Sequence, residues 1–366
     1  MARPRGRIER LPGVRVLLVA GLGLWLSGCA SMAYYGHLIK GQTEVLAART
    51  PIAEVVADPD TDETLRRRLQ RVDQARGFAV AQLALPESGS YRSYVELDRR
   101  YVLWNVFAAP EFSMQAYRWC NWLYGCFAYR GYYREAPAQR EAERLEAQGM
   151  DTHIGGVPAY STLGWFDDPL LWSMMYWDDD TLLETLFHEL AHERLFVKGD
   201  TAFNESYASF VGEEGLRQWA ASRGLPPPSA SVQRQRRSGF VALVEDTRRQ
   251  LESLYSQPLS TEAMRARKTE IIDAMRARYR RLRDVQWDGW GGYDHWFDAP
   301  INNAKLLTIG LYHQWVPAFA ALFAEMGEDW SAFHDAVEAL ADAPRDERRN
   351  RLEQLAAQQP GARAPR

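Results

Sequence analysis

The sequence predicts an α+β fold that is mostly helical, and three observations support this prediction. Long stretches carry apolar residues at helical spacing and end at proline or at residues that cap helices. Strand-forming residues concentrate instead in two segments, 91–107 and 153–166. The 44 basic and 48 acidic residues are interspersed without a basic patch, so we expect no nucleic-acid partner.

The N-terminus has the pattern of a lipoprotein signal peptide over residues 1–28. Five arginines precede a short apolar run at 16–26, which ends in LSGC, the pattern of a lipoprotein signal-peptidase site. We expect Cys29 to be lipidated and residues 29–60 to form the lipidated N-terminus and a linker. The apolar run is too short to span a bilayer, although an uncleaved anchor is the alternative. The lipid would hold the protein on the periplasmic side of the bacterial cell envelope, and Ala30 resembles the pattern of lipoproteins sent to the outer membrane.

Helical patterns recur along the rest of the chain. One helix is expected at 61–85, where Pro86 ends it. Further helices are expected at 135–149, 316–326 and 330–341.

A helical hairpin is expected within a single domain that covers residues 61–357, with a disordered tail at 358–366. The segment 232–283 has two amphipathic stretches that are separated at Pro258 and Ser260. The sequence leaves open whether this hairpin docks beside a functional site or projects toward a protein partner.

Cys120 and Cys126 enclose a loop short enough for a local disulfide. In the oxidising periplasm the disulfide is the favoured state, and two buried thiols are the alternative. A metal site at these cysteines is not expected, because no nearby histidine or second cysteine pair completes it.

The run His188-Glu189-Leu190-Ala191-His192 is the most informative motif. Residues 181–187 before it have helical apolar spacing, and the aspartates at 178–180 can cap a helix there. On that helix His188 and His192 leave the same face and can bind one metal ion, while Glu189 can reach a water beside the ion. The alternative is a pair of surface histidines on an amphipathic helix.

A second helix is expected over 203–212, after Gly199 stops the first at its C′ position, and Asp200 can cap this second helix. Small residues share one face with Glu205, so this helix could pack closely against the first and bring the Glu205 carboxylate to the metal. Glu213 and Glu214 are weaker competitors because they lie further along the helix. A solvated carboxylate is the alternative interpretation of Glu205.

Zinc suits this set of donors. A catalytic zinc ion has three protein ligands and one open position, and it lowers the pKa of a coordinated water to about 7. His188, His192 and Glu205 would supply the three ligands. Ligating imidazoles usually donate their other N–H to an oxygen, and Asn204 and Asp200 are the candidates for this role.

The stretch HELAHERLFVKGDTAFNESYASF resembles bacterial lipoproteins described as predicted aminopeptidases, which are zinc metallopeptidases of the gluzincin kind. The likeness includes YVLWNVFAAPEF, YRGY, GVPAYSTLGWF and NNA, and so covers most of the mature chain. The resemblance implies a zincin-like core with a small sheet over the metal helix. It also implies that His188, His192 and Glu205 bind zinc and that Glu189 is the general base. Partly by this resemblance, we expect the segment 157–163 to be an edge strand that pairs with peptide substrates.

Two further roles would remain to be filled in such an enzyme. The tetrahedral oxyanion needs a donor besides zinc, and Tyr160 is the first candidate, with His313 and Tyr207 after it. An aminopeptidase also needs an acid that holds the substrate ammonium. The sequence offers Glu111, Asp167, Asp168 and Glu193 without choosing among them.

Three functions are therefore weighed. The favoured one is a zinc aminopeptidase that trims peptides near the cell envelope. The second is a zinc endopeptidase or other amide hydrolase. The third is a non-catalytic lipoprotein with a structural metal site, which Glu189 disfavours because a structural site needs no base.

Overall fold

A computed structural model describes residues 33–121, 125–159, 162, 166–226, 230–309 and 314–358. The chain divides into two compact units, residues 1–48 and residues 49–366. In the first unit, residues 33–47 form a helix. The expected signal peptide, Cys29 and residues 359–366 of the expected tail lie outside the described residues.

The second unit is mostly helical with small sheets, which confirms the α+β fold class. Its helices are α2 (Ile52–Ala57), α3 (Glu63–Gln82), α4 (Glu135–Glu146), α5 (Asp179–Arg194), α6 (Thr201–Ser222), α7 (Ala230–Tyr255), α8 (Thr261–Arg281), α9 (Asp294–Asp298), α10 (Asn303–Leu306), α11 (Val316–Glu325), α12 (Trp330–Asp342) and α13 (Arg345–Ala357). A 3₁₀ turn, η1 (Trp172–Tyr176), precedes α5, and a π turn, η2 (Leu282–Gln286), follows α8. Within the described residues no helix is both long enough and apolar enough to cross a membrane.

Three small sheets lie within the described residues. The largest places β3 (Leu103–Pro110) between β6 (Arg130–Tyr132) and β7 (Met150–Val157), and both pairings are antiparallel. A second sheet joins β1 (Thr50–Pro51), β2 (Ser93–Val95) and β8 (Leu170–Leu171). The third pairs β4 (Trp119–Asn121) with β5 (Gly125–Phe127), and the predicted disulfide between Cys120 and Cys126 joins these two strands.

The strand expected at 153–166 is placed differently in the structure. β7 starts earlier, at Met150, and ends at Val157, because Pro158 has no N–H to continue the ladder. β7 is an edge strand, as expected for the peptide-binding segment, but Val157 is the only residue of 157–163 within it. Residues 160–161 and 163–165 lie outside the described part of the chain.

Residues 50–57 were expected in a linker, but they form β1 and α2 of the second unit. Thr50 pairs with Tyr94 of β2, and the Ile52 side chain is buried. β1 and α2 are too short to show a periodicity in the sequence. They can be identified only from their contacts in the folded chain, such as the pairing of β1 with β2.

The helices follow the sequence signals closely where capping residues are present. Asp62 accepts hydrogen bonds from the first turn of α3, and Asp329 does the same for α12. The helical hairpin is confirmed as α7 and α8, with Ser260 capping α8. One face of the hairpin packs against α9, α10 and the end of β3. Side chains in this cluster include Phe240, Val244, Leu251, Met275, Tyr279 and Phe297.

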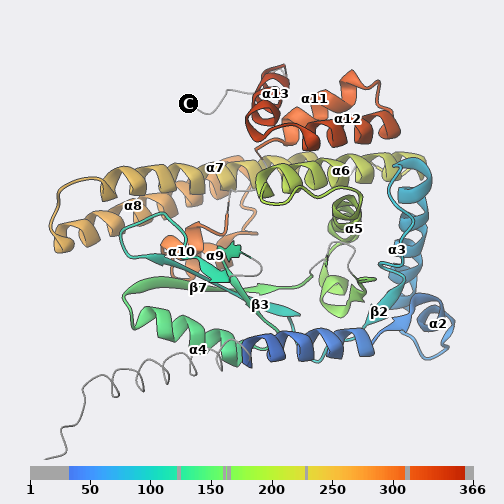
Figure 1. Ribbon diagram of the computed structural model, residues 1–366, viewed down its shortest axis with the longest axis horizontal. Coiled ribbons are helices and arrows are strands. Elements are labelled where there is room, and N and C mark those ends of the chain that lie inside the picture. Colours follow the sequence, from blue (N-terminus) through green and yellow to red (C-terminus); the bar gives the residue numbers. More distant parts are fainter. Residues whose placement is uncertain are drawn as a thin grey trace, which may run out of the picture. The chain divides into compact units, whose positions relative to one another are not determined.

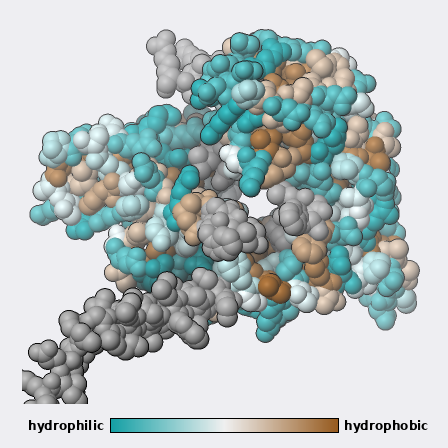
Figure 2. Space-filling model, in the orientation of Figure 1, coloured by the Kyte–Doolittle hydropathy of each residue, from teal (hydrophilic) through white to brown (hydrophobic). Residues whose placement is uncertain are grey.

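Helix α6 is the central element around the site. It packs against α5 on one side, while α11 to α13 lie on the other side (Figure 1). Aromatic side chains fill the second contact, where Tyr207 and Phe210 of α6 meet Phe319 and Phe333. On the face drawn in Figure 2, the hairpin α7–α8 and the C-terminal helices present mainly hydrophilic residues, with small hydrophobic patches between them.

Candidate metal centre

Helix α5 presents the two histidines of the motif. Asp178 begins the helix by accepting a hydrogen bond from the Thr181 N–H at 2.9 Å. Buried leucines on α5 fix its rotation about its own axis, and His188 and His192 lie one turn apart on the same side. Their Nε2 atoms are 3.1 Å apart, so both imidazoles converge on one point.

Helix α6 brings Glu205 to the same point, and the small residues on its face allow this. A Cβ added to Gly212 would lie 2.8 Å from the Glu184 carbonyl oxygen and 3.4 Å from the Cβ of His188. The two helix backbones can approach this closely only because residue 212 is a glycine and has no Cβ. The expected packing of α6 on α5 is therefore present. Glu205 Oε2 lies 3.4 Å from His188 Nε2, and its Oε1 lies 3.6 Å from His192 Nε2.

The spacing of these three donors can be compared with what zinc requires. Tetrahedral zinc with bonds of 2.0–2.1 Å places its ligand atoms about 3.3 Å apart. The three separations are 3.1, 3.4 and 3.6 Å. His188, His192 and Glu205 are also the one group of potential metal ligands found among the described residues. Two imidazole nitrogens and one carboxylate therefore fit a zinc ion in both chemistry and spacing.

Electrostatics at the three side chains favour a cation. Burial disfavours the charged carboxylate of Glu205, but its contacts with His188 and His192 outweigh burial and hold the pKa of Glu205 below its usual range. Burial likewise disfavours a charged His188, whereas Glu205 and Glu189 raise the pKa of His188 above its usual value. Two carboxylates therefore act on the point where the imidazoles converge.

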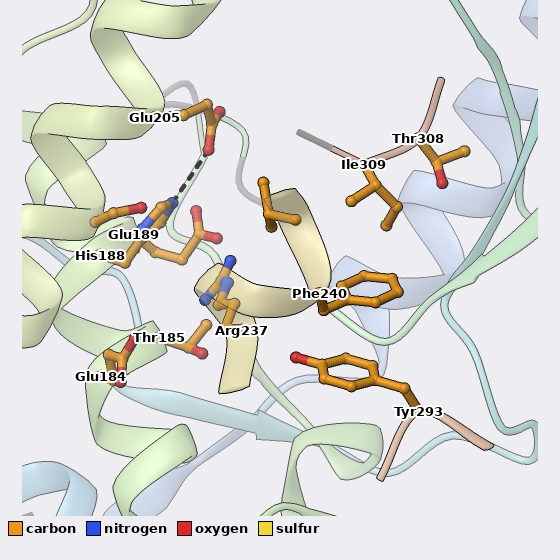
Figure 3. A pocket seen from close by; sticks show the side chains of 12 residues that line it. Glu184, Thr185, His188, Glu189, Glu205, Arg237, Phe240, Tyr293, Thr308 and Ile309 are labelled. Carbon is orange, nitrogen blue, oxygen red and sulfur yellow. Dashed lines mark ion pairs between the residues drawn. The ribbon is translucent and has the colours of Figure 1, made fainter. Parts of the chain in front are cut away.

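A cavity of about 500 Å³ opens beside the three donors, and Glu189 lines it with His188 and Glu205 (Figure 3). The hairpin forms the opposite wall through Arg237, Phe240 and Val241 of α7. The remaining lining residues are Glu184, Thr185, Ser209, Tyr293, Thr308 and Ile309. The hairpin thus docks beside the site, which is one of the two placements that the sequence left open.

Two residues expected to support the imidazoles have other roles. Both groups of the Asn204 amide bond the backbone of Val197, each at 2.8 Å, and so hold the connection between α5 and α6. Asp200 caps α6 through the Phe203 N–H, which confirms its expected capping role, and it pairs with Arg348 of α13. The prediction was wrong because nearness in sequence does not place these side chains on the imidazole side. The Nδ1 atom of His192 is buried without a hydrogen-bond partner among the described residues.

The turn at Gly199 also differs from expectation. Helix α5 ends earlier, with Leu195 at its C-cap, so Gly199 is not the C′ residue. Gly199 instead has a φ of +81°, in the left-handed region that favours glycine, within the turn before α6.

Among the expected oxyanion donors, only Tyr207 belongs to the part of the chain that the structure describes. Tyr160 and His313 lie outside the described part of the chain. Tyr207 is fully buried on the far side of α6, and its hydroxyl bonds His334 Nδ1 at 2.9 Å. Helix α6 is buried on two sides, one against α5 and one against α11 and α12. Tyr207 lies on the side that faces α11 and α12, so its hydroxyl does not point toward the three donors.

The acids expected to hold a substrate ammonium lie elsewhere too. Glu111 pairs with Arg265 of α8, and buried Asp168 accepts hydrogen bonds from Thr162. Asp167 and Glu193 do not line the cavity. Among the competing ligands, Glu214 pairs with Arg217.

Three residues near the site were missed by sequence reasoning. Glu184 and Arg237 line the cavity, and Tyr129 lies close enough to Glu205 to feel its charge. Burial and the Glu205 carboxylate both raise the pKa of Tyr129. Of these three residues, only Glu184 could have been predicted from the sequence. It lies four residues before His188 and hence on the same helix face.

Comparison with known proteins identifies the family of the chain. The chain belongs to the family described as "Putative aminopeptidase", whose model matches residues 33–352. This membership supports peptidase activity in general. Neither the curated proteins nor the solved structures include a match to the chain.

Proposed function

We propose that the protein is a zinc-dependent peptidase of the gluzincin type that acts as an aminopeptidase. The observation that carries this proposal is the convergence of His188, His192 and Glu205 beside a cavity that Glu189 also lines. A structural zinc site would be closed by a fourth protein ligand, whereas this set has three ligands and faces a cavity. The family description supports an amide bond as the target.

The proposed chemistry assigns a role to each residue of the site. Zinc, when bound, supplies a Lewis acid for the scissile carbonyl and lowers the pKa of water. Glu189 accepts the proton of the attacking water and then delivers it to the nitrogen of the leaving amine. His188, His192 and Glu205 hold the metal, and α5 fixes Glu189 beside them.

Glu184 supports action at a free N-terminus. Its carboxylate lines the same cavity one helical turn before His188, so it can hold the ammonium of a substrate. This residue replaces the acids that the sequence suggested. The second candidate function, an endopeptidase, would have no need of an acid at that place.

The test uses the full chain purified in detergent, with free and N-acetylated peptides as substrates. We expect cleavage of the free peptides only, loss of activity with a chelator, and recovery on adding zinc. Glu189→Gln should retain one equivalent of zinc and lose turnover by at least about 100-fold, because a general base contributes 10²–10⁴-fold. Cleavage of N-acetylated peptides would instead support the endopeptidase. A protein that binds zinc and cleaves no peptide would support the non-catalytic alternative.

We further propose that the protein is anchored by lipid at Cys29 in the cell envelope, facing the periplasm and in the outer membrane. The signal-peptide pattern before Cys29 supports this location. The disulfide between Cys120 and Cys126 suits such an oxidising compartment. Radiolabelled fatty acid should be incorporated into the wild type and not into Cys29→Ser.

A further inference from the structure

Arg237 brings a fixed positive charge to the wall of the cavity opposite α5. It lies on α7, three residues before Phe240, so the packing of Phe240 holds the backbone from which the exposed Arg237 side chain extends. The Phe240 side chain is buried and stacks on Tyr293 with ring centroids 4.2 Å apart and an interplanar angle of 8°. It also contacts Trp296 and Phe297 edge-on. The backbone of α7 is therefore held firmly at this turn, with Arg237 directed toward the cavity (Figure 3).

Arg237 shares the cavity with two of the proposed metal ligands. It lines the cavity on the side of α7, and His188 and Glu205 line it on the side of α5 and α6. The charge of Arg237 also acts on Tyr293, where it opposes the effect of burial, which raises the pKa of Tyr293. A permanent cation there weakens the binding of a metal ion, whatever else the guanidinium contacts, and favours an anion in the cavity.

We propose that Arg237 is a catalytic residue that donates hydrogen bonds to the oxyanion formed when water attacks the scissile carbonyl. This inference rests on the proposed peptidase function. In the attack, the water oxygen bonds to the carbonyl carbon and the π electrons move onto the carbonyl oxygen, while the water proton passes to Glu189. When the C–N bond breaks, the carbonyl re-forms and the proton passes from Glu189 to the leaving nitrogen. Arg237 contacts the oxygen between these two steps.

The chemistry of the cavity favours Arg237 over its neighbours for this role. A guanidinium stays protonated throughout and presents several N–H donors in a fixed plane. Thr185, Ser209, Tyr293 and Thr308 also line the cavity, but their hydroxyls carry no permanent positive charge. Three carboxylates, those of Glu184, Glu189 and Glu205, line the same cavity and would repel a substrate carboxylate. An oxyanion that exists only during the reaction therefore suits Arg237 better than a carboxylate that the substrate carries permanently.

Arg237→Gln in the full chain tests the proposal, with Arg236→Gln as the matched control. Arg236 is the neighbouring residue on α7, but its guanidinium lies over the Trp290 ring at 4.7 Å and does not line the cavity. We expect Arg237→Gln to lower kcat about 100- to 1000-fold with KM within threefold, as for loss of one oxyanion donor. A phosphinic peptide that mimics the tetrahedral oxyanion should lose affinity by a similar factor.

A third readout needs no turnover. Removing a positive charge near the three ligands should tighten zinc binding to the metal-free protein by about threefold or more, measured by competition with a chromogenic chelator. This measurement also shows that the variant folds with its site intact. Arg236→Gln should match the wild type in all three measurements.

Two results would overturn the inference while leaving the proposed function in place. One is a kcat of Arg237→Gln within threefold of an active wild type. The other is a rise in KM alone that occurs with free-acid peptides and not with their C-terminal amides, which would show that Arg237 binds a substrate carboxylate. A wild type that neither binds zinc nor cleaves peptides would remove the proposed function and this inference together.

Discussion

His334 of α12 is a buried histidine whose protonation state follows from its two partners. Its Nε2 lies 2.9 Å from the carbonyl oxygen of Leu83, which can only accept, so Nε2 carries the hydrogen. Its Nδ1 must then accept a hydrogen bond from the Tyr207 hydroxyl. This neutral imidazole joins α12 to α6 and to the end of α3. Burial lowers the pKa of His334 to about 4, although the bond to the Leu83 carbonyl favours the charged form.

Stability should therefore fall in mild acid. Between pH 6.5, the pKa of an exposed histidine, and about 4, the unfolded chain binds a proton that folded His334 does not. The folded state is then destabilised by about 3 kcal/mol on going from pH 7 to pH 4 through this residue. Urea titrations across this range would give the unfolding free energy at each pH. In His334→Gln this free energy should change less steeply with pH than in the wild type, by about 1.4 kcal/mol per pH unit, which corresponds to one proton. His295→Gln, at an exposed position, is the control. Equal slopes for His334→Gln and the wild type would contradict the assignment.

At the scale of elements, the contact between α5 and α6 creates the metal centre. His188 and His192 belong to one helix, but Glu205 reaches them only because α6 approaches closely at Gly212. A second glycine, Gly215, is close to Leu83 and Phe187, so the approach extends along α6. The separation of the two helices thus sets how far Glu205 lies from the imidazoles.

Gly212→Ala should destabilise the protein by about 1–3 kcal/mol and weaken zinc binding, because its Cβ would meet the Glu184 carbonyl oxygen at 2.8 Å. Gly77→Ala on α3 is a matched control, since nothing lies within 4 Å of the added Cβ. There the substitution should stabilise the helix by about 0.5–1 kcal/mol. Chemical unfolding and zinc titration would measure both variants. Two variants of the same stability would show that α5 and α6 can separate at no cost.

For the whole second unit, a buried polar network joins the hairpin to the largest sheet. Lys268 of α8 contacts Asp151 of β7 at 2.6 Å and the Glu111 carbonyl oxygen at 2.9 Å. Asn303 of α10 donates its backbone N–H to Asp151, and its amide donates to backbone carbonyls that follow β3. Tyr255 of α7 donates to the Asn303 side chain. The NNA motif therefore holds the hairpin in the position from which it lines the cavity.

Lys268→Met should destabilise the fold by about 3 kcal/mol, because it leaves the Asp151 carboxylate without its cation; the two side chains are only 11% and 18% exposed. Arg267→Met is the control, since Arg267 pairs with Glu270 at the surface and should change stability by less than about 1 kcal/mol. Unfolding by guanidinium would measure both. A loss of stability as small for Lys268→Met as for Arg267→Met would show that the network does not hold the hairpin.

Much of the fold could be predicted from local patterns, and the misses share a cause. Helix caps and apolar spacing located α3, the hairpin and the metal helix, because these signals act within one element. Asn204 and Tyr207 were misassigned because helix spacing does not tell which neighbour each face meets. Asn204 instead holds the turn at Val197, and Tyr207 faces the C-terminal helices. The placement of Arg237 beside the site depends on contacts between segments far apart in the chain.

The sequence by itself determined the helical character of the protein and the two imidazoles of the motif, because residues four apart on one helix must share a face. It also held the small residues that let a second helix come close. Only the tertiary structure decided that Glu205 meets both imidazoles and that the hairpin forms one wall of the cavity with Arg237. These contacts depend on which buried faces pack together, and that is settled by the shape and burial of the whole unit.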